Sequence, residues 1–229
     1  MAGLLRASRS AAVVGGVLLP MYLLIHPPRD AASVAASAYA GIHVLGILAM
    51  LLVLCGLPAL CLPLVRQPGR LAPFSTGLAF VATALWLGYL FLDAYLNPLL
   101  ATYAPELVHT PSAMDTQFRI IGPALLMLPL TSGLFVVAYT ALGLALIRAG
   151  GSRRYAGGLL LLGALVFGPG PSVPLAVETL GGVLFGAGVV LAALAPSRQR
   201  ARSSQAAISR PGSIEQRAGR RDPAAAGPC

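Results

Sequence analysis

Residues 74–96 read FSTGLAFVATALWLGYLFLDAYL, and this stretch decides the class of protein. It is an apolar run of the length that crosses the hydrocarbon core of a bilayer as an α-helix, which takes about 20 residues. Its single charged residue, Asp93, lies three positions before its end. The run therefore predicts a transmembrane helix, and the aspartate inside it needs a physical explanation.

The composition of the whole chain agrees with a membrane protein. Of its 229 residues, 57% are hydrophobic and only 10% are charged, and the mean hydropathy is +0.80. A soluble domain of this length needs a larger polar share to cover its surface. A transmembrane β-barrel would show segments of about ten residues with alternating polarity, whereas the apolar runs here are continuous. We therefore expect an all-α, polytopic helix bundle in the cell membrane, in contact with the lipid bilayer.

Six apolar runs in residues 1–195 predict membrane spans. The first resembles a signal peptide, but His26-Pro27-Pro28 separates it from any cleavage site, so we expect a retained span. Prolines end several runs, because proline cannot continue a helix and disfavours helix in the preceding residue. In the fourth run, Pro123, Pro129 and Thr131-Ser132-Gly133 predict a tilted or broken helix. The expected spans are 11–26, 40–63, 74–96, 119–147, 155–168 and 175–195.

The arginines predict the orientation of this bundle. Residues 196–229 are rich in Arg, Ser, Ala, Pro and Gly, so we expect a disordered basic tail. One side of the predicted bundle carries this tail and most other arginines, and the opposite side carries only Arg29 and Arg119. By the positive-inside rule both termini are then cytoplasmic. The rule also explains the net charge of +9, so we expect no nucleic-acid partner.

The ionisable residues of the predicted spans lie near the outer side. His26 ends the first span, and His43, Asp93 and Glu178 each lie about one helical turn, roughly 5 Å, from an outer boundary. The cytoplasmic halves of the predicted spans contain no acid and no histidine. Because an ionisable group costs several kcal/mol at the bilayer centre, this asymmetry predicts a polar site that opens outward.

Two interpretations of this polar site are open. In the first, Asp93 is a structural partner of Arg119 or of a histidine, and Trp86, Tyr89 and Tyr95 belong to an aromatic belt. In the second, Asp93 and Glu178 are catalytic carboxyl groups that donate a proton to a lipophilic small molecule. The residues that would bind this substrate are Trp86, Tyr89, His26, His43 and Arg119.

Other functional motifs are absent from the sequence. It contains no Walker loop, no nucleotide-binding glycine fingerprint and no HExxH motif. The three histidines are well separated along the chain, and Cys55 and Cys61 lack a zinc-binding spacing, so we expect no metal and no cofactor. The motif Gly182-Val183-Leu184-Phe185-Gly186 predicts close helix packing, inside one chain rather than in a dimer. The oligomeric state is left open.

Several short motifs resemble those of a known group of proteins. The chain combines His26-Pro27-Pro28, His43, the stretch Phe91-Leu92-Asp93-Ala94-Tyr95 followed by Pro98, and Ala104-Pro105-Glu106-Leu107. Over residues 11–195 this pattern resembles a large group of small actinobacterial six-span membrane proteins, most of which have no assigned function. In size and hydropathy the chain is also similar to the membrane-bound terpene cyclases of meroterpenoid and indole-sesquiterpene pathways, of the xiamycin and indosespene type.

The likeness to terpene cyclases implies a role in isoprenoid secondary metabolism. It implies cyclisation of a prenylated substrate without a metal, with Asp93 and Glu178 as the acids. The ring faces of Trp86, Tyr89 and Phe91 would stabilise the developing carbocation. Two alternatives use the same carboxyl groups: a proton-linked transporter or efflux accessory, and a non-catalytic structural or regulatory membrane protein.

Overall fold

The computed structural model describes residues 2–65, 70–105 and 127–195, and every regular element in these ranges is a helix. The prediction of an all-α membrane protein is therefore confirmed. The predicted tail, 196–229, lies outside the described residues. The elements are α1 (Ala2–Leu24), α2 (Ala31–Ala35), α3 (Ala38–Val65), α4 (Leu71–Tyr103), α6 (Met127–Ala149), α7 (Arg153–Phe167), the 3₁₀ turn η3 (Gly170–Ser172) and α8 (Leu175–Leu194).

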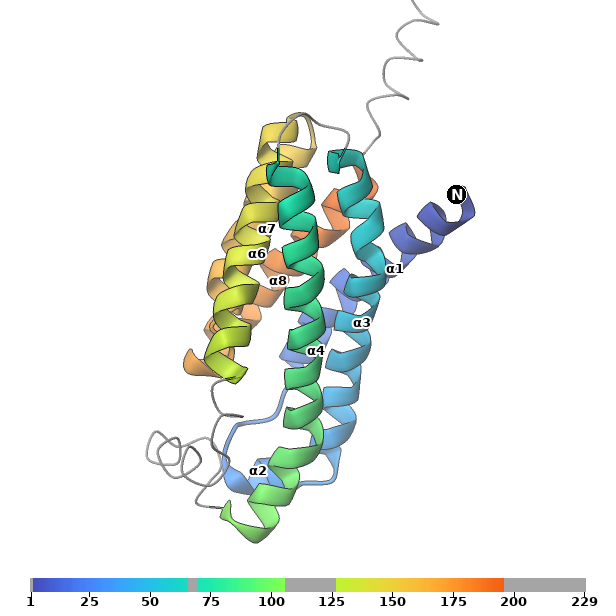
Figure 1. Cartoon of the computed structure of the whole chain (residues 1–229). Coiled ribbons are helices and arrows are strands. Elements are labelled where there is room, and N and C mark those ends of the chain that lie inside the picture. Colours follow the sequence, from blue (N-terminus) through green and yellow to red (C-terminus); the bar gives the residue numbers. More distant parts are fainter. Residues whose placement is uncertain (1, 66–69, 106–126, 196–229) are drawn as a thin grey trace, which may run out of the picture. The chain divides into compact units, whose positions relative to one another are not determined.

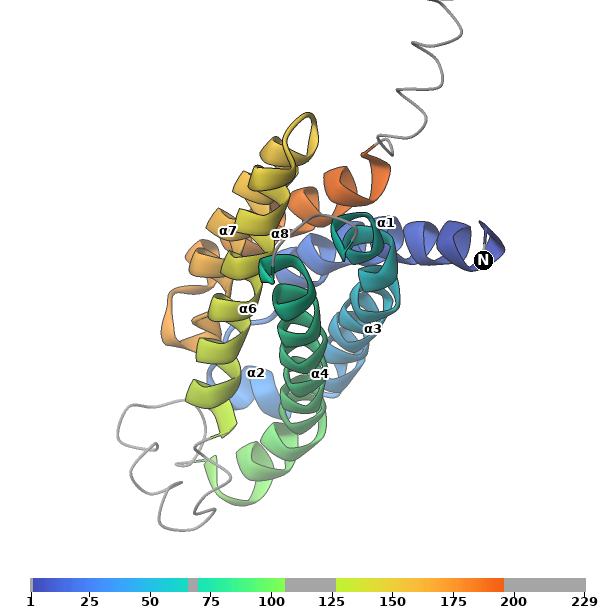
Figure 2. The same cartoon turned by 45° about the horizontal axis from the view of Figure 1, so that its top comes forward.

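The six long helices pack in a closed ring (Figures 1 and 2). Each contacts the next along the chain, in the order α1, α3, α4, α6, α7 and α8, and α8 returns to contact α1. Successive helices run in opposite directions, so α1, α4 and α7 end where α3 and α8 begin. We call this end of the ring the polar end. The short helix α2 lies there against α4.

Five helices are long and apolar enough to cross a membrane. They are Gly3–Leu24, Ala38–Val65, Leu71–Tyr103, Pro129–Ala149 and Leu175–Leu194. The 15 residues of α7 span about 22 Å at 1.5 Å per residue, which is less than the hydrocarbon thickness of about 30 Å. The predicted fifth span is thus a shorter member of the ring, packed between α6 and α8.

The predicted end of the third span at residue 96 is wrong, because α4 continues through Pro98 to Tyr103. In the added turns, Ala101 is buried in a small cluster with Val34 of α2 and Tyr39 of α3. The free energy gained by this burial offsets the loss of the backbone hydrogen bond that Pro98 cannot donate. The same packing fixes α2 and the start of α3 against α4, and this holds the polar end together.

The predicted break in the fourth span is also wrong within the described residues. Helix α6 runs without interruption through Thr131-Ser132-Gly133, and Pro129 lies in the first turn of its described part. Proline is tolerated in a first helical turn, where its missing N–H has no intrahelical partner. Thr131 and Ser132 are buried, and packing overrides their weak helix propensity. Pro123 lies outside the described residues.

Glycines allow the first and last helices of the ring to approach closely. A side-chain carbon added to Gly16 of α1 would lie 2.8 Å from the carbonyl oxygen of Gly186 in α8, and Gly186 faces Gly16 in the same way. Gly182, one turn earlier, lies against Leu23 of α1. The glycine motif of the last span therefore packs inside the chain, as predicted.

A serine of α1 supports α3 near one of its prolines. Pro58 has no N–H, and the hydroxyl of Ser8 reaches across from α1 to the backbone around it. This hydroxyl lies 2.9 Å from the carbonyl oxygen of Cys55, to which it donates, and it accepts from the N–H of Ala59 at 3.1 Å. A buried polar backbone left unpaired would cost about 1–3 kcal/mol, so Ser8 ties α1 to α3.

Replacement of Gly186 with valine should push α1 and α8 apart. Overpacking a close-packed interior costs about 1–3 kcal/mol, and each kcal/mol lowers the Tm of a chain of this size by about 2–4 °C. We expect a lower Tm in detergent. Gly77→Ala is the matched control, because nothing lies within 4 Å of the carbon it adds. Equal Tm values for the two variants would contradict the close approach.

Candidate functional site

Four elements bring polar side chains together at the polar end. His26 and Arg29 lie in the connection after α1, and His43 lies in the second turn of α3. Asp93 lies on α4, and Glu178 lies in the first turn of α8. The predicted gathering of acids and histidines at one end of the bundle is therefore observed for the described residues. Arg119 and His109 lie outside them.

The structure shows what Asp93 does inside its apolar helix. The hydroxyl of Tyr39 donates to its Oδ1 at 2.7 Å, and the amide of Asn97 donates to the same oxygen. The Nε2 atom of His43 lies 3.0 Å from the other oxygen, Oδ2. Asp93, Tyr39 and His43 are all buried. Of the two structural partners proposed for Asp93, the histidine is the one observed.

Backbone carbonyls determine which nitrogen of each histidine carries a hydrogen. The Nδ1 of His43 lies 2.9 Å from the carbonyl oxygen of Tyr39, and the Nδ1 of His26 lies 2.7 Å from that of Pro27. A carbonyl oxygen can only accept, so each Nδ1 must donate. Burial lowers the pKa of His26 to about 4, so its ring is neutral at pH 7 and its Nε2 bears a lone pair.

The two histidines lie side by side although 17 positions separate them in the sequence. Their ring centroids are 4.9 Å apart, and the ring of Tyr22 lies 5.5 Å from each. The prediction that His26 and His43 belong to one polar site agrees with this contact. The reason is the antiparallel packing of α1 and α3, which places the end of one helix beside the start of the other.

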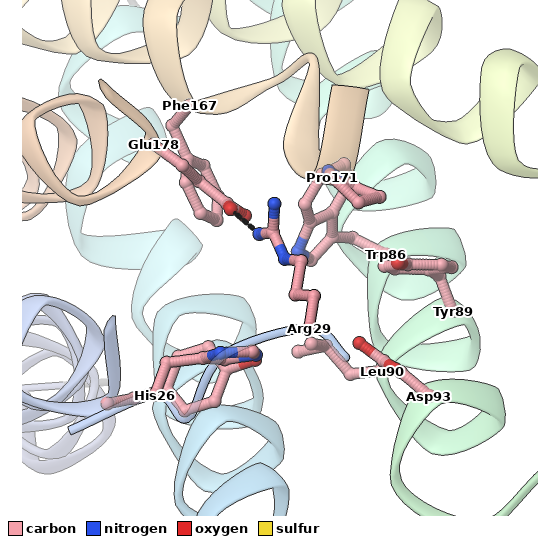
Figure 3. Close-up of a pocket in the computed structure, with 10 residues that line it drawn as sticks. His26, Arg29, Trp86, Tyr89, Leu90, Asp93, Phe167, Pro171 and Glu178 are labelled. Carbon is pink, nitrogen blue, oxygen red and sulfur yellow. Dashed lines mark hydrogen bonds and ion pairs between the residues drawn. The ribbon is translucent and has the colours of Figure 1, made fainter. Parts of the chain in front are cut away.

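The cation of the site is Arg29 (Figure 3). One guanidinium nitrogen donates to the carboxylate of Glu178, and another donates to the carbonyl oxygen of Val173 at 3.2 Å. The side chains of Arg29 and Glu178 are 19% and 7% exposed. The ion pair therefore joins the connection after α1 to the first turn of α8. The predicted cation was Arg119, which is not among the described residues.

These groups surround a pocket between α1, α4, α7 and α8. Asp93 and Glu178 both line it, so the two predicted catalytic carboxyl groups share one site. The free space inside it is about 10 Å³, at the lower limit for holding one water molecule. The other polar residues of its lining are Tyr22, His26, Arg29 and Tyr89.

Trp86 forms a wall of this pocket and is not part of a lipid-facing belt. It is 2% exposed, and its ring packs against those of Phe135 and Phe167, with centroids 4.8 and 5.2 Å away. Its Nε1 is buried without a hydrogen-bond partner in the described part of the chain. Phe91, which the cyclase resemblance placed beside a carbocation, is 50% exposed and does not line the pocket.

Sequence reasoning missed three residues of the site: Tyr22, Tyr39 and Arg29. The tyrosines had a usable signal, because each precedes a histidine of the site by four positions, as Tyr89 precedes Asp93. Residues four apart lie on the same face of a helix. Arg29 had a weaker signal, since it follows His26 by three positions in the same connection.

Comparison with known proteins finds no matching family model, no matching curated protein and no matching solved structure. The resemblances to small actinobacterial membrane proteins and to membrane-bound terpene cyclases therefore stay predictions, and the function has to be argued from the site.

Removal of Arg29 should destabilise the protein. Arg29→Ala leaves the carboxylate of Glu178 buried and unpaired, and breaking such a pair costs about 3–5 kcal/mol. We expect the lower end of this range, because Arg29 is partly exposed. The double variant Arg29→Ala/Glu178→Gln should recover most of the loss, measured as Tm in detergent. If Arg29→Ala is as stable as the wild type, the ion pair does not contribute to folding.

Proposed function

We propose that this protein is a membrane-embedded enzyme that acts on a lipophilic molecule with an oxygen-containing group, such as an epoxide. The observation that carries the proposal is the indole N–H of Trp86, which has no partner among the described residues and lies in the same pocket as the carboxylate of Glu178. A buried donor without a partner costs about 1–3 kcal/mol. The oxygen of a substrate would accept this hydrogen bond and be held beside Glu178.

The different surroundings of the two carboxyl groups suggest different roles. Both oxygens of Asp93 are held by side chains, namely Tyr39, Asn97 and His43. Glu178 is paired with Arg29, which lies in a connection rather than in a helix. A substrate that displaces the guanidinium would meet the carboxyl group directly. We therefore assign proton transfer to Glu178, and Asp93 organises the wall beside it.

Acid-initiated cyclisation of a prenylated epoxide fits this arrangement chemically. Once Arg29 is displaced, the carboxylate of Glu178 is buried and unpaired, so it would take up a proton from water. The resulting carboxyl group would donate this proton to the epoxide oxygen as a C–O bond breaks, and a double bond of the chain would attack the cationic carbon. The final cation loses a proton to the carboxylate, so the substrate is isomerised and the acid is restored. The ring of Trp86 offers a face that stabilises positive charge.

The small free volume of the pocket limits how such a substrate is bound. Drug-sized ligands occupy pockets of about 300–1,000 Å³, whereas the free space here is about 10 Å³. Only the oxygen-bearing end fits without movement, and the apolar chain remains between helices or in lipid. Displacement of Arg29 from Glu178 is the change that would enlarge the site, because its side chain lies inside the lining.

The distribution of charge supports access from the outer side. Among the described arginines, Arg29 alone lies at the polar end, and the other six lie toward the opposite end of the ring. The positive-inside rule places those six at the cytoplasmic face, with the termini. The described acids and histidines all lie at or near the polar end, which favours an enzyme open to one side over a proton relay. The six arginines toward the opposite end of the ring are Arg6, Arg9, Arg70, Arg148, Arg153 and Arg154.

The enzyme proposal predicts a loss of product formation on substitution of Glu178. In a host that supplies prenylated, epoxidised precursors, the wild type should form a cyclised product detectable in lipid extracts. Glu178→Gln should lower its formation by about 10²-fold or more, and Trp86→Phe, which removes the N–H, by about 10-fold. Tyr95→Phe is the control, because Tyr95 is exposed and lies outside the pocket. Full activity of Glu178→Gln at equal protein levels would refute its assigned role.

The orientation is tested separately, by labelling of single cysteines in a cysteine-free chain. Ser37→Cys lies at the polar end and Ser152→Cys at the opposite end, and both positions are exposed. A maleimide that cannot cross membranes should label Ser37→Cys in intact cells and Ser152→Cys only after the membranes are opened. The reverse pattern would place the pocket on the cytoplasmic side.

A further inference from the structure

The side chains of His26, His43 and Asp93 form a compact set of metal-ligating groups. One ring nitrogen from each histidine and one carboxylate oxygen lie within 4.8 Å of one another, and all three residues are buried. They come from three separate segments, namely the connection after α1, the start of α3 and the last third of α4. Their meeting is therefore a product of the fold and not of a local sequence motif.

His26 is held in the form that binds metals, and His43 would reach the same form once its Nε2 gives up the hydrogen that it donates to Asp93. In each, Nδ1 donates its hydrogen to a backbone carbonyl, that of Pro27 for His26 and that of Tyr39 for His43. A neutral imidazole with a hydrogen on Nδ1 carries its lone pair on Nε2. Histidine ligands in proteins almost always donate their other N–H to a carbonyl, a carboxylate or water, which fixes the ring and raises its basicity.

The carboxylate of Asp93 is supported in the same way. Its Oδ1 accepts hydrogen bonds from Tyr39 and Asn97, while Oδ2 faces the Nε2 of His43 at 3.0 Å. Ligating carboxylates are commonly hydrogen-bonded through the oxygen that does not contact the metal. Tyr39 supports two ligands at once, since its hydroxyl holds Asp93 and its backbone carbonyl holds His43.

We propose that His26, His43 and Asp93 bind one divalent transition-metal ion. Two imidazole nitrogens and one carboxylate oxygen suit zinc, iron or copper, and they do not suit magnesium or calcium, which prefer oxygen ligands only. Around zinc, ligand atoms about 2.0–2.1 Å from the ion stand roughly 3.4 Å from each other. Rotation of the side chains would bring atoms that lie up to 4.8 Å apart to that separation, and would widen the 3.0 Å between His43 and Asp93.

Three protein ligands leave a coordination position open, as catalytic zinc sites do. His26 and Asp93 both line the pocket that contains Glu178 and Trp86, so the open position faces this pocket. The ion would act there as a Lewis acid toward an oxygen-bearing ligand. The binding proposal rests on the geometry of the three side chains alone and does not require that the pocket be catalytic.

Metal titration of the purified full-length protein tests the proposal. The chain is purified in detergent without a polyhistidine tag, in a background in which Cys55, Cys61, Cys229 and His109 are replaced, so that His26 and His43 are the only histidines left. After treatment with a chelator, zinc is added and bound zinc is measured by equilibrium dialysis. We expect saturation at about one ion per chain and a higher Tm in its presence.

Three variants distinguish the proposed site from other binding. His26→Gln and Asp93→Asn should weaken zinc binding by more than about 10-fold, and Tyr39→Phe by about 10- to 100-fold. Glu178→Gln is the matched control, because it changes a carboxylate of the same pocket that is not a ligand, and its zinc affinity should equal that of the background. Unchanged affinity in His26→Gln, or an equal loss in Glu178→Gln, would overturn the assignment.

Cobalt provides a readout that does not depend on how well the variants fold. In the background chain, Co²⁺ bound by nitrogen and oxygen ligands in a four-coordinate site should give visible absorption bands that zinc abolishes. If the background protein shows neither these bands nor saturable zinc binding, the proposal is refuted, whatever the product assay gives. If zinc binds but Glu178→Gln retains full product formation, the enzyme role of Glu178 fails while the metal site stands.

Discussion

The hydrogen bonds that Asp93 accepts are the interaction on which the polar end depends. A carboxylate placed in an apolar ring of helices must be surrounded by donors, because an unpaired buried charge costs several kcal/mol. The donors come from Tyr39 and His43 of α3, and from Asn97 one turn further along α4. The need to satisfy one acid therefore sets how α3 lies on α4. It also orients His43, whose ring packs against that of His26 and holds the connection after α1 in place.

Close packing at the other contact of α1 brings the second half of the site into position. Gly16 and Gly186 allow α1 and α8 to approach until their backbones touch, which closes the ring. Because Glu178 lies two turns before Gly186 on α8, this approach carries its carboxylate to the end of α1, where Arg29 pairs with it. The pocket is thus bounded by one hydrogen-bonded contact and one glycine contact, which have different physical origins. Neither contact alone would bring Asp93 and Glu178 into a common lining.

The extent to which sequence predicts this protein differs between its levels of structure. Apolar runs and arginine positions indicate a six-helix bundle, and the confinement of acids and histidines to one end follows from the cost of burying charge. Helix ends were less predictable. Pro98 indicates the end of a helix, whereas α4 continues past it because Ala101 packs against α2 and α3. Arg29 and Tyr39 were missed because pairing across helices depends on which helices become neighbours. The packing order of a membrane bundle is not encoded in the pattern of any single span, so the sequence predicted a common site for His26 and His43 but not the direct contact of their rings.

Closure of the ring by contact between its first and last helices has a consequence for biosynthesis. A ribosome releases α1 long before α8, so Arg29 and the rings of His26 and His43 enter the membrane without the wall that later covers them. The pocket forms only when α8 inserts and the carboxylate of Glu178 pairs with the guanidinium of Arg29. The site is therefore incomplete until α8 has been synthesised and inserted, and any species that lacks α8 exposes one guanidinium group and two imidazole rings to lipid. Such an exposed polar groove is the kind of defect by which membrane quality control distinguishes unfinished chains from finished ones.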